Sequence, residues 1–182
     1  MNCWKSINVK REYNPKKLQF GAAGLMMITF IMTYLFFSFW HTSPVYADIS
    51  FIGILLFIAI LFPGHILLHY LPLFTVGSHT SLTIERTKKR NVPYLVFRSK
   101  KPISKNVYIF SMIFPCLITG LFSAAGAFFM PSLLPYFLIL FAVNAGFALY
   151  DYIYVKQLLT APKHCFIEKK QHGMHILIKQ PA

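Results

Sequence analysis

Three long stretches without a charged side chain constrain the fold of this 182-residue chain more than any other feature. Residues 20–40 and 50–73 contain no Asp, Glu, Lys or Arg, and neither does the longer stretch 106–150. A helix needs about 20 predominantly apolar residues to cross the hydrocarbon core of a membrane. The third stretch is about twice that length, and Pro131 and Pro135 interrupt it near its middle, which predicts two helices. The sequence therefore predicts an all-α membrane protein with four transmembrane helices, at about residues 20–40, 50–71, 107–130 and 133–154.

The positive charges indicate how these helices cross the membrane. All 18 Lys and Arg residues precede the first span, lie in the loop 72–106 or follow the fourth span. Positively charged flanks are retained in the cytoplasm, so we expect a multi-pass protein of the cell membrane with a cytoplasmic N-terminus and C-terminus. The expected organisation is a basic N-terminal segment 1–19, a membrane domain 20–155 and a cytoplasmic tail 156–182.

Composition supports the same interpretation and argues against nucleic-acid binding. The chain is 56% apolar, 17% aromatic and only 13% charged, which is too apolar for an ordinary soluble domain. Its net charge of +13 would otherwise indicate a nucleic-acid partner, but retention of positive charge on the cytoplasmic side already accounts for it. The predicted partner is the lipid bilayer, and no nucleic acid is expected.

Two short segments outside the spans have the pattern of β-hairpins. In the middle loop, residues 81–84 and 94–97 are strand-like runs on either side of a polar turn. In the tail, residues 165–167 and 174–178 flank a polar turn that contains Gly173. We therefore expect one small cytoplasmic hairpin in each segment.

Three ionisable residues interrupt the apolar spans. His65 and His69 are four residues apart, so both imidazoles lie on one helix face, and Asp151 is the one carboxylate within any span. Counted from the outer ends of their helices, the histidines lie about 22 to 29 Å deep and Asp151 about 27 Å deep, at 1.5 Å per residue. Two neutral imidazoles and a carboxylate at one depth are a sufficient ligand set for Zn²⁺ with an open fourth position.

A simpler interpretation of the same residues stays open at this point. Histidines near a membrane boundary can hydrogen bond to a neighbouring carbonyl group, and Asp151 can pair with Lys156 or Arg98 in the interfacial region.

The region from about residue 50 onward resembles the putative zincin peptidase family of small bacterial membrane proteins, distant relatives of the site-2 intramembrane metalloproteases. The resemblance rests on the span ending in His65-x-x-x-His69, the basic loop with a hairpin, and Asn144 with Asp151 seven residues later. It rests further on Leu158-Leu159, Pro162-Lys163, Glu168 and Gly173. The resemblance implies that His65, His69 and Asp151 are zinc ligands and that Asn144 helps to hold substrate or transition state.

The chain departs from the family pattern at the residue that matters most for hydrolysis. The zincin motif is His-Glu-x-x-His, in which Glu is the general base, and Ile66 stands at that position. The family glycines before the aspartate are replaced by Ala148-Leu149-Tyr150, which predicts a bulky neck beside Asp151.

Three functional classes follow from this pattern. We favour a degenerate peptidase that acts as a membrane binding or regulatory protein and captures a membrane protein client. The second class is an active zinc-dependent intramembrane metallopeptidase with an unrecognised base. The third is a small transporter or haem carrier, which we disfavour because haem ligation in helical bundles usually uses histidines from different helices.

Overall fold

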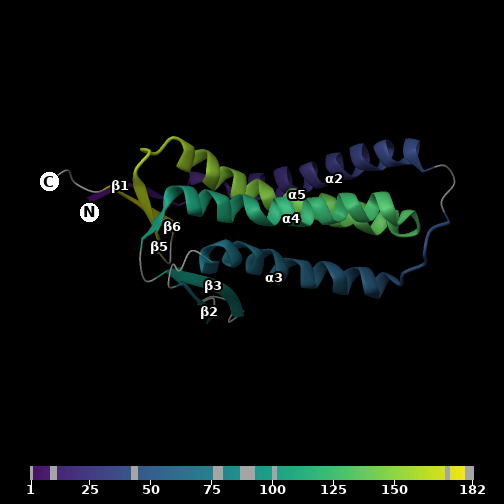
Figure 1. The fold of residues 1–182 in the computed structure, drawn as a ribbon, viewed down its shortest axis with the longest axis horizontal. Coiled ribbons are helices and arrows are strands. Elements are labelled where there is room, and N and C mark those ends of the chain that lie inside the picture. Colours follow the sequence, from purple (N-terminus) through teal and green to yellow (C-terminus); the bar gives the residue numbers. More distant parts are fainter. Residues whose placement is uncertain are drawn as a thin grey trace.

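A computed structural model describes residues 2–8, 12–41, 45–75, 80–86, 93–99, 102–170 and 173–178. Within residues 80–86, 93–99, 169–170 and at 173 it describes the backbone alone. Four long helices lie side by side and a small sheet covers one end of them (Figure 1).

The described residues contain four helices that are long and apolar enough to cross a membrane. They are α2 (Pro15–Trp40), α3 (Phe51–Thr75), α4 (Lys105–Phe129) and α5 (Leu134–Leu159). At 1.5 Å per residue each is about 38 Å long, which exceeds the thickness of the hydrocarbon core of about 30 Å. The prediction of a four-helix, multi-pass membrane protein is confirmed.

The two helix boundaries that differ most from those expected lie next to charged residues, which can occupy the ends of a membrane helix. α2 begins at Pro15 rather than near residue 20, and the Asn14 side chain caps it by accepting a hydrogen bond from the Lys16 backbone N–H at 3.0 Å. α5 continues to Leu159 rather than ending near residue 154. Long lysine side chains extend from helix ends toward water, so a charge-free window underestimates helix length.

The break between the third and fourth helices lies where the prolines predict it. α4 ends at Phe129, and a 3₁₀ turn, η1 (Pro131–Leu133), leads into α5. The connector between α2 and α3 is fixed to this turn: the Ala47 N–H donates to the Ser132 carbonyl at 2.8 Å, and the Tyr136 hydroxyl donates to the Ala47 carbonyl at 2.7 Å. We call this end of the bundle, formed by residues 45–50 and 130–133, the connector end.

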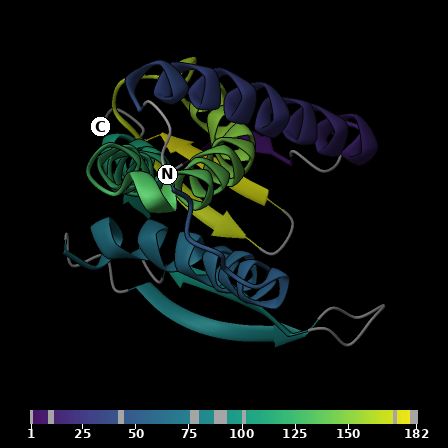
Figure 2. The same ribbon diagram turned by 90° about the vertical axis from the view of Figure 1, so that its right-hand side faces the viewer.

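In the bundle, α5 packs between α2 and α4, and α3 packs on α4 (Figures 1 and 2). Where α2 meets α5, Gly146 leaves room for the Met26 side chain, which a Cβ atom at this position would overlap. Small residues allow membrane helices to approach closely. α5 is thus held on both sides, and it is the helix that carries Asp151 and Asn144.

A four-stranded antiparallel sheet covers the end opposite the connectors, which we call the sheet end. Its strands are β1 (Asn2–Ile7), β4 (Ile103–Ser104), β5 (Cys165–Lys170) and β6 (Gly173–Ile178), in the order β1-β6-β5-β4. The sequence predicted the two tail strands but neither β1 nor β4. The segment 1–19 is therefore more than a basic extension, since it supplies a strand and the first turns of α2.

The middle loop contains a second, two-stranded sheet. β2 (Thr80–Arg86) pairs antiparallel with β3 (Pro93–Ser99), in a register that sets Thr80 opposite Ser99 and Arg86 opposite Pro93. The expected turn between them falls on residues 87–92, outside the described residues.

The sheet end has an apolar core of its own. Ile7, Ile103, Ile167 and Ile176 come from the four different strands and are at most 4% exposed. They pack with buried residues at the ends of the helices, among them Leu73, Tyr108 and Leu158. Because alternate residues of a strand point to opposite faces, each strand contributes its apolar face to the helices. The sheet therefore closes the bundle beside the last turns of α3 and α5.

Candidate metal centre

His65 and His69 lie one turn apart on the inward face of α3. Both are buried, at 8% and 6% exposure, although α3 is otherwise largely exposed along its apolar length. The two rings are nearly perpendicular, with centroids 4.8 Å apart. The spacing of four residues thus places both imidazoles where α3 faces the rest of the bundle, as the sequence predicts.

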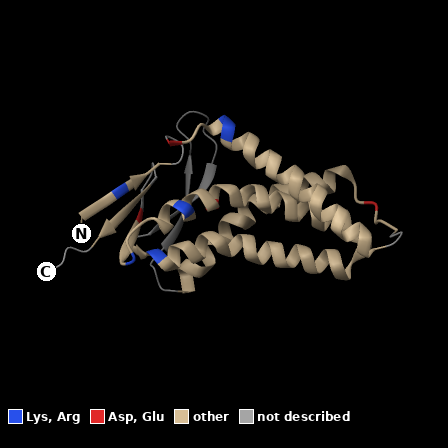
Figure 3. Cartoon of the chain, turned by 90° about the horizontal axis from the view of Figure 1, so that it is seen from above, with Lys and Arg blue, Asp and Glu red and all other residues tan. Residues whose placement is uncertain are grey.

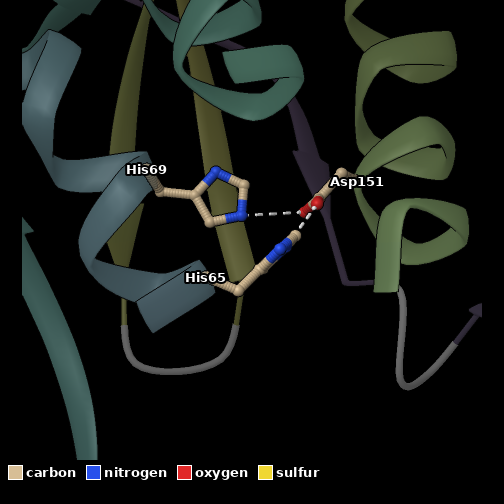
Figure 4. Close-up of side chains that lie close together, drawn as sticks. All are labelled: His65, His69 and Asp151. Atoms are coloured by element: carbon tan, nitrogen blue, oxygen red, sulfur yellow. Dashed lines mark hydrogen bonds and ion pairs between the residues drawn. The ribbon is translucent and has the colours of Figure 1, made fainter. Parts of the chain in front are cut away.

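Asp151 on α5 meets both histidines, with one carboxylate oxygen directed at each (Figure 4). Its Oδ2 is 3.1 Å from His65 Nε2, and its Oδ1 is 3.3 Å from His69 Nε2. One ligand atom from each residue can be chosen so that all lie within 4.8 Å of one another. The structure therefore brings the three predicted ligands together from two helices, and Asp151 faces the histidines rather than Lys156.

The orientation of His69 is fixed by α4. His69 Nδ1 lies 2.8 Å from the backbone carbonyl oxygen of Ser111, and the Ser111 hydroxyl donates to the His69 carbonyl at 2.5 Å. A carbonyl oxygen can only accept, so Nδ1 carries a proton and donates it. The sequence left open whether a histidine here would bond to a carbonyl, and His69 does so through the nitrogen that does not face Asp151.

The ligand atoms of His65, His69 and Asp151 fit a divalent metal ion. With its proton on Nδ1, a neutral His69 presents the Nε2 lone pair toward Asp151, and Asp151 presents an oxygen lone pair in return. A cation between two such acceptors relieves their repulsion. Two histidines and one carboxylate are the protein ligands of many catalytic zinc sites, which keep a fourth position open. The hydrogen bond on the far ring nitrogen is also typical of metal-bound histidine.

A general base is missing from this group. Ile66, at the position of the zincin glutamate, is half-buried and apolar. Within the described part of the chain, the group holds no acidic residue besides Asp151. Glu12 instead accepts a hydrogen bond from Gln157 at 2.8 Å, and Asp48 lies at the connector end. Among the side chains that the structure describes, the candidate ligand group therefore contains no second carboxylate to accept a proton.

Asn144 lies two turns before Asp151 on α5, about 10 Å away along the helix axis. Its Nδ2 donates to the Cys116 carbonyl on α4 at 3.2 Å, while its Oδ1 is buried and has no hydrogen-bond partner among the described residues. Asn144 is 3% exposed, and such an unpaired acceptor in an apolar interior costs about 1–3 kcal/mol. The structure thus places Asn144 on the same helix as Asp151 but outside the cluster of ligand atoms.

Two residues that contact the candidate ligands were not predicted from the sequence. Ser111 binds His69, and Phe147 packs edge-to-face on His65 with centroids 5.4 Å apart. Phe147 could have been noticed because it lies one turn before Asp151 on the same helix face. The expected bulky neck is partly turned away, since Leu149 packs toward Gly21 on α2, where a Cβ would lie 3.6 Å from Leu149 Cδ2.

Comparison with known proteins gives one result that bears on this geometry. A search of curated proteins and a search of solved structures each returned no match. A scan of protein families matches residues 55–166 to the family described as putative zincin peptidase. This region contains His65, His69 and Asp151 and covers more than half of the chain. The chain therefore belongs to the putative zincin peptidase family.

Proposed function

We propose that this protein is a zinc-binding membrane protein that has lost peptidase chemistry and binds a membrane protein client instead of cleaving it. The observation that carries this proposal is the intact ligand group around Asp151 beside an isoleucine at the general-base position. Selection for hydrolysis would keep the base with the ligands, whereas a binding role requires only the ligands and their surroundings.

The residues that would hold zinc are His65, His69 and Asp151, each through one ligand atom. Bound zinc supplies a Lewis acid at an open fourth position, where it can polarise a carbonyl group. Peptide hydrolysis also requires a proton acceptor, and removal of a general base typically lowers the rate by about 10²- to 10⁴-fold. An isoleucine cannot accept a proton, so a bound carbonyl would be held without being cleaved.

Asn144 supports a binding role. Its Oδ1 is an unpaired, buried acceptor on the helix that also carries Asp151. An extended peptide segment has backbone N–H groups that need an acceptor when they leave water. Asn144 is therefore the residue we assign to hold a client backbone.

We infer that the site opens toward the cytoplasm in the cell membrane. The described Lys and Arg residues gather at the sheet end, and the connector end shows acidic charge alone (Figure 3). Positive charge is retained on the cytoplasmic side, which assigns the sheet end to that side. His69 lies six residues before the end of α3 at Thr75, so the ligands are close to this end.

Metal analysis of the purified protein tests the zinc site. We expect about one zinc per chain, since the ligand set forms one four-coordinate site, and a large loss of zinc in His65→Ala, His69→Ala and Asp151→Ala. The matched control is His164→Ala, because His164 is an exposed histidine in the turn before β5. Wild-type protein that remains metal-free after zinc loading, or equal zinc in ligand variants and control, would refute the site.

A gain-of-function substitution tests the loss of peptidase chemistry. Ile66→Glu restores a carboxylate next to His65 and should create zinc-dependent cleavage of a membrane substrate that the wild type only binds. The double variant Ile66→Glu with His69→Ala is the control and should be inactive. Chelator-sensitive cleavage by the wild type would instead show an active metallopeptidase with another base and would contradict our proposal.

A further inference from the structure

α4 carries a proline in its interior, one turn after Ser111. Pro115 lies within the helix Lys105–Phe129 and is fully buried. In an α-helix each backbone N–H donates to the carbonyl four residues earlier, and proline has no N–H. The carbonyl that loses its intrahelical donor because of Pro115 is that of Ser111.

The carbonyl freed in this way is the one that binds His69. Ser111 is completely buried, and its oxygen lies 2.8 Å from His69 Nδ1. A backbone carbonyl in a membrane interior needs a donor within the protein, because lipid offers none. The imidazole N–H supplies what the missing N–H of residue 115 cannot. Pro115 on α4 and His69 on α3 are therefore complementary: the proline leaves the Ser111 carbonyl without a helical donor, and the histidine supplies one.

We propose that Pro115 is a positioning residue of the metal centre. By leaving the Ser111 carbonyl without a helical donor, it retains the His69 proton on Nδ1 and leaves the Nε2 lone pair directed at Asp151. This inference rests on the proposed zinc site for its purpose, but the hydrogen bond and the tautomer exist without metal. A residue that orients a metal-binding histidine in this way typically contributes about 10- to 100-fold to metal affinity.

The informative substitutions restore the N–H at residue 115. Pro115→Val keeps a side chain of similar size in a buried position, and Pro115→Ala removes bulk as a second variant. In both, the new N–H competes with His69 for the Ser111 carbonyl. The matched control is Pro135→Val, because Pro135 occupies the first turn of α5. In the first turn of a helix a backbone N–H has no intrahelical carbonyl to accept its hydrogen bond.

The first measurement is the tautomer of His69 in metal-free protein labelled with ¹⁵N-histidine. The resonance is assigned by its loss in His69→Gln, and the spectrum is recorded at an alkaline pH above which the histidine signals no longer change. Wild type and Pro135→Val should carry the proton on Nδ1, and the Pro115 variants should show a new population with the proton on Nε2. A wild-type Nε2–H tautomer, or no change in folded Pro115 variants, would overturn the proposal.

The second measurement is zinc affinity by competition with a chelator. Pro115→Val should bind zinc about 10-fold or more weakly, while its thermal stability stays equal or rises because the helix regains a hydrogen bond. Lower affinity with higher stability separates positioning from general damage, whereas unchanged affinity would overturn the role of Pro115 at the metal. If the wild type binds no zinc, the proposed function fails, and the tautomer measurement still decides whether Pro115 orients His69.

Discussion

Ser111 and His69 are joined by two hydrogen bonds that run in opposite directions between α4 and α3. The Ser111 hydroxyl donates to the His69 carbonyl, and the His69 imidazole donates to the Ser111 carbonyl. Both residues are buried, so neither bond competes with water. The two bonds have separate roles. The Ser111 hydroxyl joins the two helices, and the Ser111 carbonyl determines which ring nitrogen of His69 carries the proton.

Replacement of the Ser111 hydroxyl tests this separation. Ser111→Ala should lower the free energy of unfolding by about 0.5–1.5 kcal/mol, because one interhelical hydrogen bond is lost. The His69 tautomer should not change, since the Ser111 carbonyl remains. The control is Ser38→Ala, whose exposed hydroxyl bonds only to Leu35 of its own helix and should have little effect on reversible unfolding. A switch to the Nε2–H tautomer in Ser111→Ala would show that the hydroxyl and not the carbonyl orients the ring.

Packing of α2 on α5 depends on the absence of a side chain at Gly146. Gly146→Ala should destabilise the protein by about 1–3 kcal/mol, because the added methyl group would overlap Met26. Gly24→Ala is the matched control, since a Cβ at Gly24 has no neighbouring atom within 4 Å. Thermal unfolding of both variants in detergent checks the prediction. Equal melting temperatures would mean that the flexible Met26 side chain can move aside at no cost.

The orientation of the chain in the membrane can be measured with cysteine reagents. In a variant with the three native cysteines replaced by alanine, Asp48→Cys should react with a membrane-impermeant maleimide in intact cells. Lys163→Cys should react only after permeabilisation, because the lysine-rich sheet end is predicted to face the cytoplasm. The reverse pattern of labelling would mean that the topology is inverted. Labelling of both sites in intact cells would contradict the three spans, α3, α4 and α5, that separate residues 48 and 163.

The native cysteines should differ strongly in their reactivity. Cys165 is 2% exposed and belongs to the core beneath the sheet, and burial raises the pKa of its thiol. Because alkylation requires the thiolate, a raised pKa means less reactive thiolate at any given pH and a rate curve displaced to higher pH. Cys3 is exposed and should be alkylated first, as measured by mass spectrometry over a pH series. Alkylation of Cys165 as fast as Cys3 in folded protein would show that the sheet opens readily.

The spans and the grouping of His65, His69 and Asp151 could be predicted because membranes impose simple rules. A charge-free stretch of sufficient length has few alternatives to a helix, and two prolines marked the break before α5. The depth of His65, His69 and Asp151 follows from a rise of 1.5 Å per residue once the ends of the spans are known. These rules are local or one-dimensional, so they can be read from a single sequence.

Contacts between distant segments could not be predicted in the same way. β1 pairs with β6, which lies about 170 residues later, with Ile7 opposite Met174 and Asn2 opposite Ile178. β4 has only two residues, too few for a strand pattern. The sequence also did not show that Ser111 on α4 would bind His69 on α3, because that requires the packing of two helices. In each case the missing information is which surfaces meet.

The pairing of β1 with β6 sets an order of events during synthesis. β1 is made first and β6 only after all four helices have emerged, so the N-terminal strand must wait unpaired while the membrane segments are inserted. The histidines and the aspartate can therefore come together before the sheet exists. Formation of the sheet, and of the core around Ile7, is then a late step. A truncated chain that lacks β6 would leave β1 unpaired and able to pair with the strands of other chains.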